Sequence, residues 1–132
     1  MNERYISWLK QAEKDLEWAK DSLTHHHYAQ TCFIAQQIGE KSLKALAYYR
    51  GFDVIKSHSI VKIAQELKIN GPIANAGQRL DLYYISSRYP DAVPDMGIPS
   101  EYFNEEQAKE AISYAEFILK NINKLITAKD HS

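Results

Sequence analysis

Arg88 is the residue whose type and neighbours point most directly to ligand chemistry. It precedes Tyr89 and Asp91 at the start of a stretch that contains three prolines and a glycine. A guanidinium group can bind a phosphate through two parallel hydrogen bonds, and an aromatic ring can stack on a base. Arg88, Tyr89 and Asp91 are therefore candidates for binding a nucleotide or RNA. The alternative is that Arg88 pairs with Asp91 or Asp95 and pins the loop.

A second group of candidates forms a polar strip, which consists of Gln36, Gln37, Glu40, Lys41 and Lys44. Glu40 and Lys44 stand four residues apart, which is the spacing of an ion pair on one face of a helix. The strip either faces solvent, where such pairs are weak, or lines a polar cleft. In the second case Glu40, Lys41 and Lys44 join the candidate nucleotide- or RNA-binding residues.

His58 is the candidate acid or base, because histidine side chains change protonation near neutral pH. It could serve in RNA cleavage only where the fold brings it beside Arg88. The alternative is that His58 caps a helix or packs beneath it.

Metal binding and thiol chemistry have weaker support. Consecutive residues on a helix point about 100° apart, so at most two imidazoles of the run 25–27 could share a small ion. A solvated turn is the preferred interpretation of this run, and no metal is expected. Cys32 falls among Ala29, Phe33 and Ile34, where a buried thiol is inert.

Composition limits the function further. The chain has 132 residues, with 16 Lys and Arg against 17 Asp and Glu. This balance excludes a polybasic nucleic-acid binder, so any such contact must come from a local basic patch. Cys32 is the single cysteine, which forbids an intrachain disulfide. No GxGxxG, P-loop, HExxH or GxSxG pattern, signal peptide or membrane span is recognised, so we expect a cytoplasmic protein without a cofactor.

The candidates must be positioned by helices, because apolar residues recur at threes and fours over about 5–23, 28–50, 60–67, 73–87 and 104–125. Gly51 is a C-cap glycine that ends the second helix, and Asn104 with Gln107 resembles a capping box. A long loop spans 89–103, and loops of that length usually have a function. We predict one all-α domain over 1–132.

The many aromatic residues favour a homodimer, in which some of them cover a partner rather than a core. The alternative is that these aromatic side chains fill the space between the long helices of one chain. The residues in question are Trp8, Trp18, Phe33, Tyr48, Tyr49, Tyr83, Tyr84, Tyr102 and Phe117.

Five segments carry a family resemblance: AEKDL at 12–16, QQIGEKSLKA at 36–45, HSI at 58–60, LYYISSRYPD at 82–91 and YFNEEQA at 102–108. As an ordered set they are similar to the HEPN family, named for higher eukaryotes and prokaryotes nucleotide-binding. The resemblance implies an up-and-down bundle of four longer helices plus one short helix, commonly a homodimer with a polar cleft between its subunits. It also implies a minimal nucleotidyltransferase as partner in a toxin-antitoxin pair. Catalytic members of the family are metal-independent endoribonucleases.

The ribonuclease motif of that family is an arginine and a histidine with four to six residues between them. Arg88 matches the arginine, but Val93, Pro94 and Asp95 stand where the histidine should be. A carboxylate such as that of Asp95 is ionised at neutral pH and is a poor proton donor. The resemblance therefore implies a noncatalytic subunit that binds nucleotide or RNA through Arg88. The alternatives are an endoribonuclease that combines Arg88 with a relocated acid or base such as His58, and a protein-interaction module without a ligand site.

Overall fold

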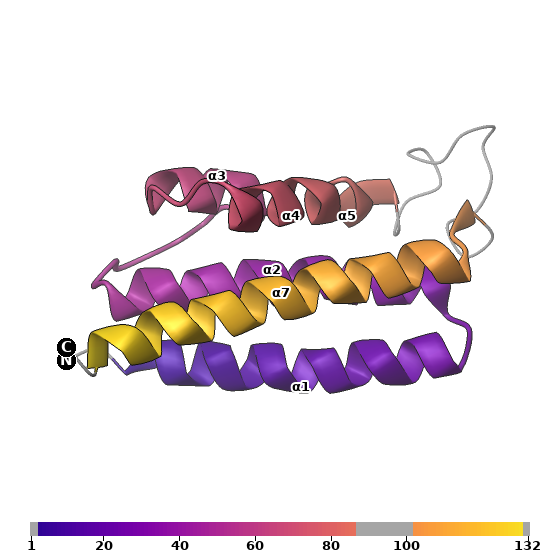
Figure 1. The fold of residues 1–132 in the computed structure, drawn as a ribbon, viewed down its shortest axis with the longest axis horizontal. Coiled ribbons are helices and arrows are strands. Elements are labelled where there is room, and N and C mark those ends of the chain that lie inside the picture. Colours follow the sequence, from indigo (N-terminus) through magenta and orange to yellow (C-terminus); the bar gives the residue numbers. More distant parts are fainter. Residues whose placement is uncertain (1–2, 87–101, 131–132) are drawn as a thin grey trace.

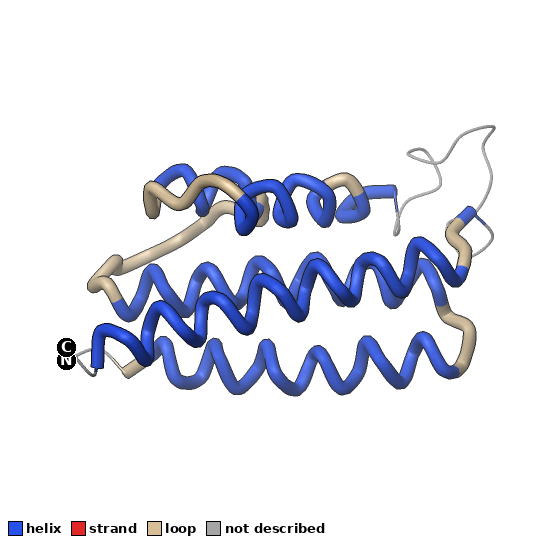
Figure 2. Tube along the Cα trace, viewed as in Figure 1, coloured by secondary structure: helices blue, strands red, loops and turns tan. Residues whose placement is uncertain are grey.

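Three long helices form the body of the molecule in the computed structural model, which describes residues 3–86 and 102–130. They are α1 (Arg4–Thr24), α2 (Tyr28–Tyr49) and α7 (Glu105–Asp130). Three shorter helices, α3 (Ile60–Glu66), α4 (Pro72–Asp81) and α5 (Tyr83–Ser86), make a second layer that lies along α2 and α7 (Figure 1). The described residues contain helices, turns and loops and no strand (Figure 2). The all-α prediction is confirmed.

Helix α2 is central because both of its broad faces carry apolar residues. It packs against α1, against α7 and against each of the three short helices. Ile34, Ile38, Leu43 and Leu46 are all buried within the core. An element covered from both sides can leave polar side chains inside the protein, where they need hydrogen-bond partners.

Local signals fix the ends of two helices as predicted. Gly51 follows the end of α2 with a φ of 94°, the left-handed region in which a glycine has no Cβ penalty. At the start of α7, the Asn104 backbone N–H donates to Gln107 Oε1 at 2.9 Å. The Gln107 N–H donates in return to Asn104 Oδ1 at 2.8 Å. The predicted capping box is confirmed.

The helix expected over 73–87 is interrupted. Helix α4 ends at Asp81, and a turn at Leu82 separates it from the single turn of α5. Apolar residues continue on both sides of this turn, so their periodicity alone does not show the break. Within the described residues, no helix is both long and apolar enough to cross a lipid bilayer.

Candidate functional site

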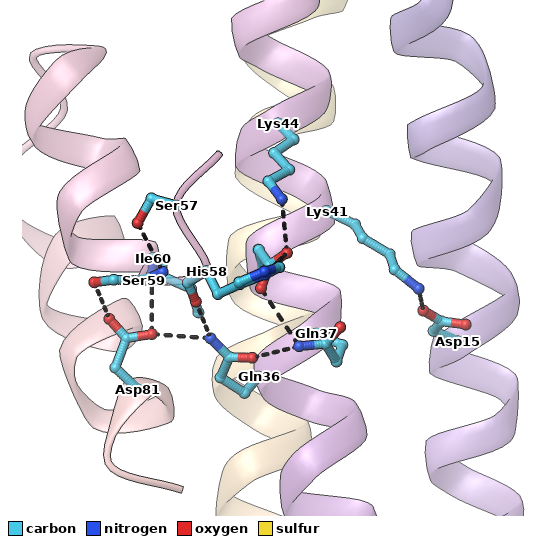
Figure 3. A network of polar contacts seen from close by, with 11 residues as sticks. Asp15, Gln36, Gln37, Lys41, Lys44, Ser57, His58, Ser59, Ile60 and Asp81 are labelled. Atoms are coloured by element: carbon cyan, nitrogen blue, oxygen red, sulfur yellow. Dashed lines mark hydrogen bonds and ion pairs between the residues drawn. The ribbon is translucent and has the colours of Figure 1, made fainter. Parts of the chain in front are cut away.

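The polar strip on α2 lies inside the protein, so the interpretation as a solvent face is wrong. The side chains of Glu40 and Lys44 are only 4% and 7% exposed. Gln36 is fully buried. The cause is the central position of α2, which has α1 on one side and the segment around His58 on the other (Figure 3).

Glu40 is the acceptor at the centre of this strip. Its Oε2 accepts a hydrogen bond from Lys44 Nζ at 2.8 Å and lies 3.3 Å from His58 Nδ1. Its Oε1 accepts from Gln37 Nε2 at 3.4 Å. The Lys44 ammonium also lies 5.5 Å from the ring centroid of Trp8, within the range of a cation–π interaction. These partners offset the cost of removing both charges from water.

A second set of bonds ties the same strip to the end of α4. Gln36 Nε2 donates to the His58 carbonyl at 2.9 Å and to Asp81 Oδ1 at 3.0 Å. Gln36 Oε1 accepts from Gln37 Nε2 at 2.8 Å, which joins this set to Glu40. Among the described residues, no buried side-chain nitrogen or oxygen lacks a partner. A fully satisfied polar network of this kind holds its members in one arrangement.

His58 is the exposed member of the network, with 63% of its side chain accessible. It neither caps a helix nor lies beneath one, because the cap of α3 is Ser59, whose Oγ accepts from the Lys62 backbone N–H at 3.2 Å. The imidazole lies parallel to the ring of Tyr84, with centroids 6.1 Å apart and an interplanar angle of 10°.

A pocket of about 340 Å³ opens beside this imidazole. Lys62 brings a positive charge to its wall, Tyr84 an aromatic face and Ser57 a hydroxyl group. Its full lining is Ser57, His58, Ser59, Lys62, Asp81 and Tyr84. Such a pocket offers a cation, a ring and a hydrogen-bonding imidazole to a small anionic or aromatic group.

The remaining candidates fall elsewhere. Lys41 reaches toward α1, where its ammonium pairs with the buried carboxylate of Asp15 (Figure 3). It therefore lies on the side of α2 away from His58. Arg88, Tyr89 and Asp91 lie outside the described residues.

The histidine run lies in a turn, and Cys32 lies in the core. His25, His26 and His27 are exposed in the turn between α1 and α2, and His26 has a φ of 64°. Within the described ranges, no three His, Cys, Asp or Glu side chains are grouped so as to hold a metal ion. Cys32 is buried as predicted. Burial, with a smaller effect of the negative charge of Glu110, raises the pKa of its thiol to about 12.

Sequence reasoning missed two carboxylates of these networks. Asp81 is the only acidic residue between 72 and 86, and the apolar stripe of this segment was the basis of its prediction as a helix. Asp15 lies next to the stripe of Ala12, Leu16 and Ala19 and is itself buried. An acidic residue on or beside an apolar stripe is the signal that could have identified both, because a buried carboxylate needs partners.

The fold and the site together define an all-α protein with a buried polar network on its central helix and an exposed histidine at one end of that network. The family model of the HEPN domain matches residues 5–125, and the chain belongs to this family.

Relatives of known structure share most of the chain. The crystal structure of TT1696 from Thermus thermophilus matches with a TM-score of 0.86 and 37% identity, over 94% of this chain and 98% of that one. ST0689, described as an archaeal HEPN homologue, matches with a TM-score of 0.81 and 35% identity, over 92% and 97%. A HEPN domain protein of Thermotoga maritima matches with a TM-score of 0.73 and 28% identity, over 92% and 98%.

One relative has a functional name. A protein of Methanocaldococcus jannaschii named "Putative toxin MJ1304" is 27% identical over 134 residues, which cover 92% of this chain and 88% of that protein.

Proposed function

We propose that this chain is a noncatalytic HEPN domain that binds a nucleotide or RNA in the pocket beside His58. The observation that carries the proposal is the exposed imidazole, anchored by Glu40 and placed in one pocket with Lys62 and Tyr84. An ammonium group and an imidazole bind phosphate, and an aromatic ring stacks on a base.

The roles of the candidate residues follow from their positions in the chain and in the fold. Arg88, Tyr89 and Asp91 follow α5 in the sequence and are proposed as direct ligand contacts. Glu40 and Lys44 are buried, so their part is to support His58. Lys41 forms an ion pair with Asp15 and so helps to hold α1 against α2.

The setting of the proposed function is a toxin-antitoxin pair. The toxin name of the Methanocaldococcus jannaschii relative and the family membership support it. In this proposal the chain is a cytoplasmic homodimer, and its partner is a minimal nucleotidyltransferase.

Binding can be measured by the fluorescence anisotropy of a labelled single-stranded RNA and of a labelled adenine nucleotide. We expect Arg88→Ala and His58→Ala each to weaken binding about tenfold or more, since each removes a charged or polar contact to the ligand. Arg79→Ala is the matched control, because Arg79 is exposed and lines a different pocket. Unchanged affinity in both site variants contradicts the proposal. If the chain co-purifies with a nucleotidyltransferase and binds neither probe, a protein-interaction module is favoured.

A second candidate function is metal-independent RNA cleavage. The contact between His58 Nδ1 and Glu40 Oε2 favours it, because a carboxylate that orients an imidazole is a common arrangement for acid–base work. RNA cleavage in EDTA that is lost in both His58→Ala and Arg88→Ala would establish this function. Cleavage that survives both substitutions would come from a contaminating nuclease.

A further inference from the structure

The carboxylate of Asp81 holds the main chain directly after His58. Its Oδ1 accepts from the Ile60 backbone N–H at 3.0 Å. Its Oδ2 accepts from the Val61 N–H at 3.0 Å and from Ser59 Oγ at 2.9 Å. One half-buried side chain of α4 therefore binds three consecutive residues at the start of α3, all within three positions of His58.

Gln36 connects this carboxylate to His58 itself. Its amide nitrogen donates both to Asp81 Oδ1 and to the carbonyl oxygen of His58. Gln36 is fully buried, so its amide has no water to bond with in place of these partners. Through Gln37 the chain of bonds reaches Glu40, which contacts the imidazole. His58 is thus held at its carbonyl by one end of the network and at its ring by the other (Figure 3).

This arrangement determines which ring nitrogen carries the proton. The Glu40 carboxylate only accepts hydrogen bonds, so Nδ1 of His58 must be the donor to it. In the neutral imidazole the proton is then on Nδ1, and Nε2 is left as an acceptor on the far side of the ring. His58 keeps this tautomer only while its main chain holds the imidazole beside Glu40.

We propose that Asp81 and Gln36 are positioning residues for His58, which hold it as the Nδ1-protonated tautomer with Nε2 directed away from Glu40. The inference deepens the proposed function, because its consequence for ligand binding rests on the pocket beside His58. Gln36 does not line the pocket. Asp81 does line it, but both of its carboxylate oxygens are taken up by their bonds to Gln36 and to the start of α3, so its proposed role is to position His58.

The test is NMR of protein labelled with ¹⁵N-histidine, in which the shifts of the two ring nitrogens report the tautomer. The chain has 5 histidines, and the spectrum of His58→Ala assigns the signals of His58. We expect wild-type His58 to be protonated on Nδ1. In Asp81→Asn and in Gln36→Met that tautomer should give way to a mixture of both.

Gln36→Met separates positioning from helix capping, because it leaves the three bonds between Asp81 and α3 in place. It also keeps the test decisive where Asp81→Asn does not fold. The control is Asp53→Asn, which removes the charge of an exposed aspartate elsewhere. The His58 signals should be the same in this control as in the wild type.

Two results overturn the inference: a wild-type His58 protonated on Nε2, or an unchanged tautomer in folded Gln36→Met. Anisotropy with the labelled RNA adds a second readout, in which Gln36→Met should bind about tenfold more weakly than Asp53→Asn. If the wild type binds neither RNA nor nucleotide, the proposed function fails, while the NMR result still decides the role of Asp81 and Gln36.

Discussion

Cys32 shows how burial changes the chemistry of a single side chain. Its thiol lies in the core, and desolvation raises its pKa from 9.0 to about 12. Between these two pH values the folded protein keeps the proton and the unfolded protein releases it. Raising the pH therefore favours unfolding over this range, while below pH 9.0 the thiol has no effect on the pH dependence.

We expect the free energy of unfolding of the wild type to fall above pH 9.0 relative to that of Cys32→Ala. The slope of the difference should be about 1.4 kcal/mol per pH unit, the value for one proton. Urea unfolding of both proteins at a series of pH values measures it. Parallel pH profiles of the two proteins would show that the thiol ionises in the fold as easily as in the unfolded chain.

The ion pair of Glu40 and Lys44 is buried on α2, so the charge of each side chain depends on the other. Lys44→Met leaves the Glu40 carboxylate buried without its ammonium partner, and we expect a loss of about 3–5 kcal/mol in unfolding free energy. The double variant Glu40→Gln, Lys44→Met should lose less than Lys44→Met alone, because no charge is then left unpaired. Urea denaturation measures both.

An exposed pair on α1 provides the control. Lys14 and Glu17 lie 3.5 Å apart, with side chains that are mostly accessible. Lys14→Met should change stability little, since exposed pairs are screened by water. A loss from Lys44→Met as small as that from Lys14→Met would contradict the structural role of the buried pair.

Ile60 determines how closely α3 approaches the neighbouring helices α2 and α4. A Cβ added at Gly77 of α4 would lie 2.4 Å from Ile60 Cγ2 and 3.1 Å from Ile60 Cβ. A Cβ added at Gly39 of α2 would lie 2.6 Å from Ile60 Cδ1. The Cδ1 atom is the far end of a flexible side chain, whereas Cβ is fixed by the backbone and Cγ2 is bonded directly to it.

We therefore expect Gly77→Ala to destabilise the protein by about 1–3 kcal/mol, as overpacking does, despite the better helix propensity of alanine. Gly39→Ala should cost less, because Ile60 can change its rotamer. Thermal and urea unfolding of both variants test this order, with exposed Gln78→Ala of α4 as the control. A larger loss in Gly39→Ala than in Gly77→Ala would mean that α4 can shift more easily than the Ile60 side chain can change its rotamer.

For the whole molecule, the exposed aromatic residues bear on assembly. Most of the aromatic set is used inside the chain, as in the stacking of Trp8 on Tyr48 and the edge contact of Tyr83 with Phe103. Trp18 remains 57% exposed, and Tyr102 and Phe117 are also exposed. Large exposed aromatic side chains are typical of surfaces that bind a partner.

We expect the purified chain to be a homodimer, with a mass twice the 15.2 kDa of one chain. Trp18→Ser should shift the equilibrium toward the monomer, because it removes a large apolar contact from α1. Val54→Ser changes an exposed apolar residue outside the helices and should have no such effect. Light scattering after size-exclusion chromatography gives the masses, and a wild-type mass of 15.2 kDa would rule out the dimer under those conditions.

The all-α class, the extents of α1 and α2, the turn at Gly51 and the capping box at Asn104 could all be predicted from the sequence. These features depend on residues within a few positions of each other, so their period and their end signals are visible in the chain. The end of α7 could not be predicted, since the expected helix stops at 125 and α7 continues to Asp130. The family resemblance likewise came from short segments in a fixed order. The break at Leu82 was not predicted, because the apolar pattern continues on both sides of it.

The burial of the polar strip of α2 and the contact between Glu40 and His58 became visible only in the folded chain. Glu40 and His58 are 18 positions apart in the chain. Gln36 and Asp81, whose side chains share a hydrogen bond, are 45 positions apart. Helical periodicity shows which residues share a face, and packing alone determines whether that face meets solvent, α1 or the start of α3. A polar strip on an exposed helix and one inside a bundle have the same pattern, so burial had to be found from the fold.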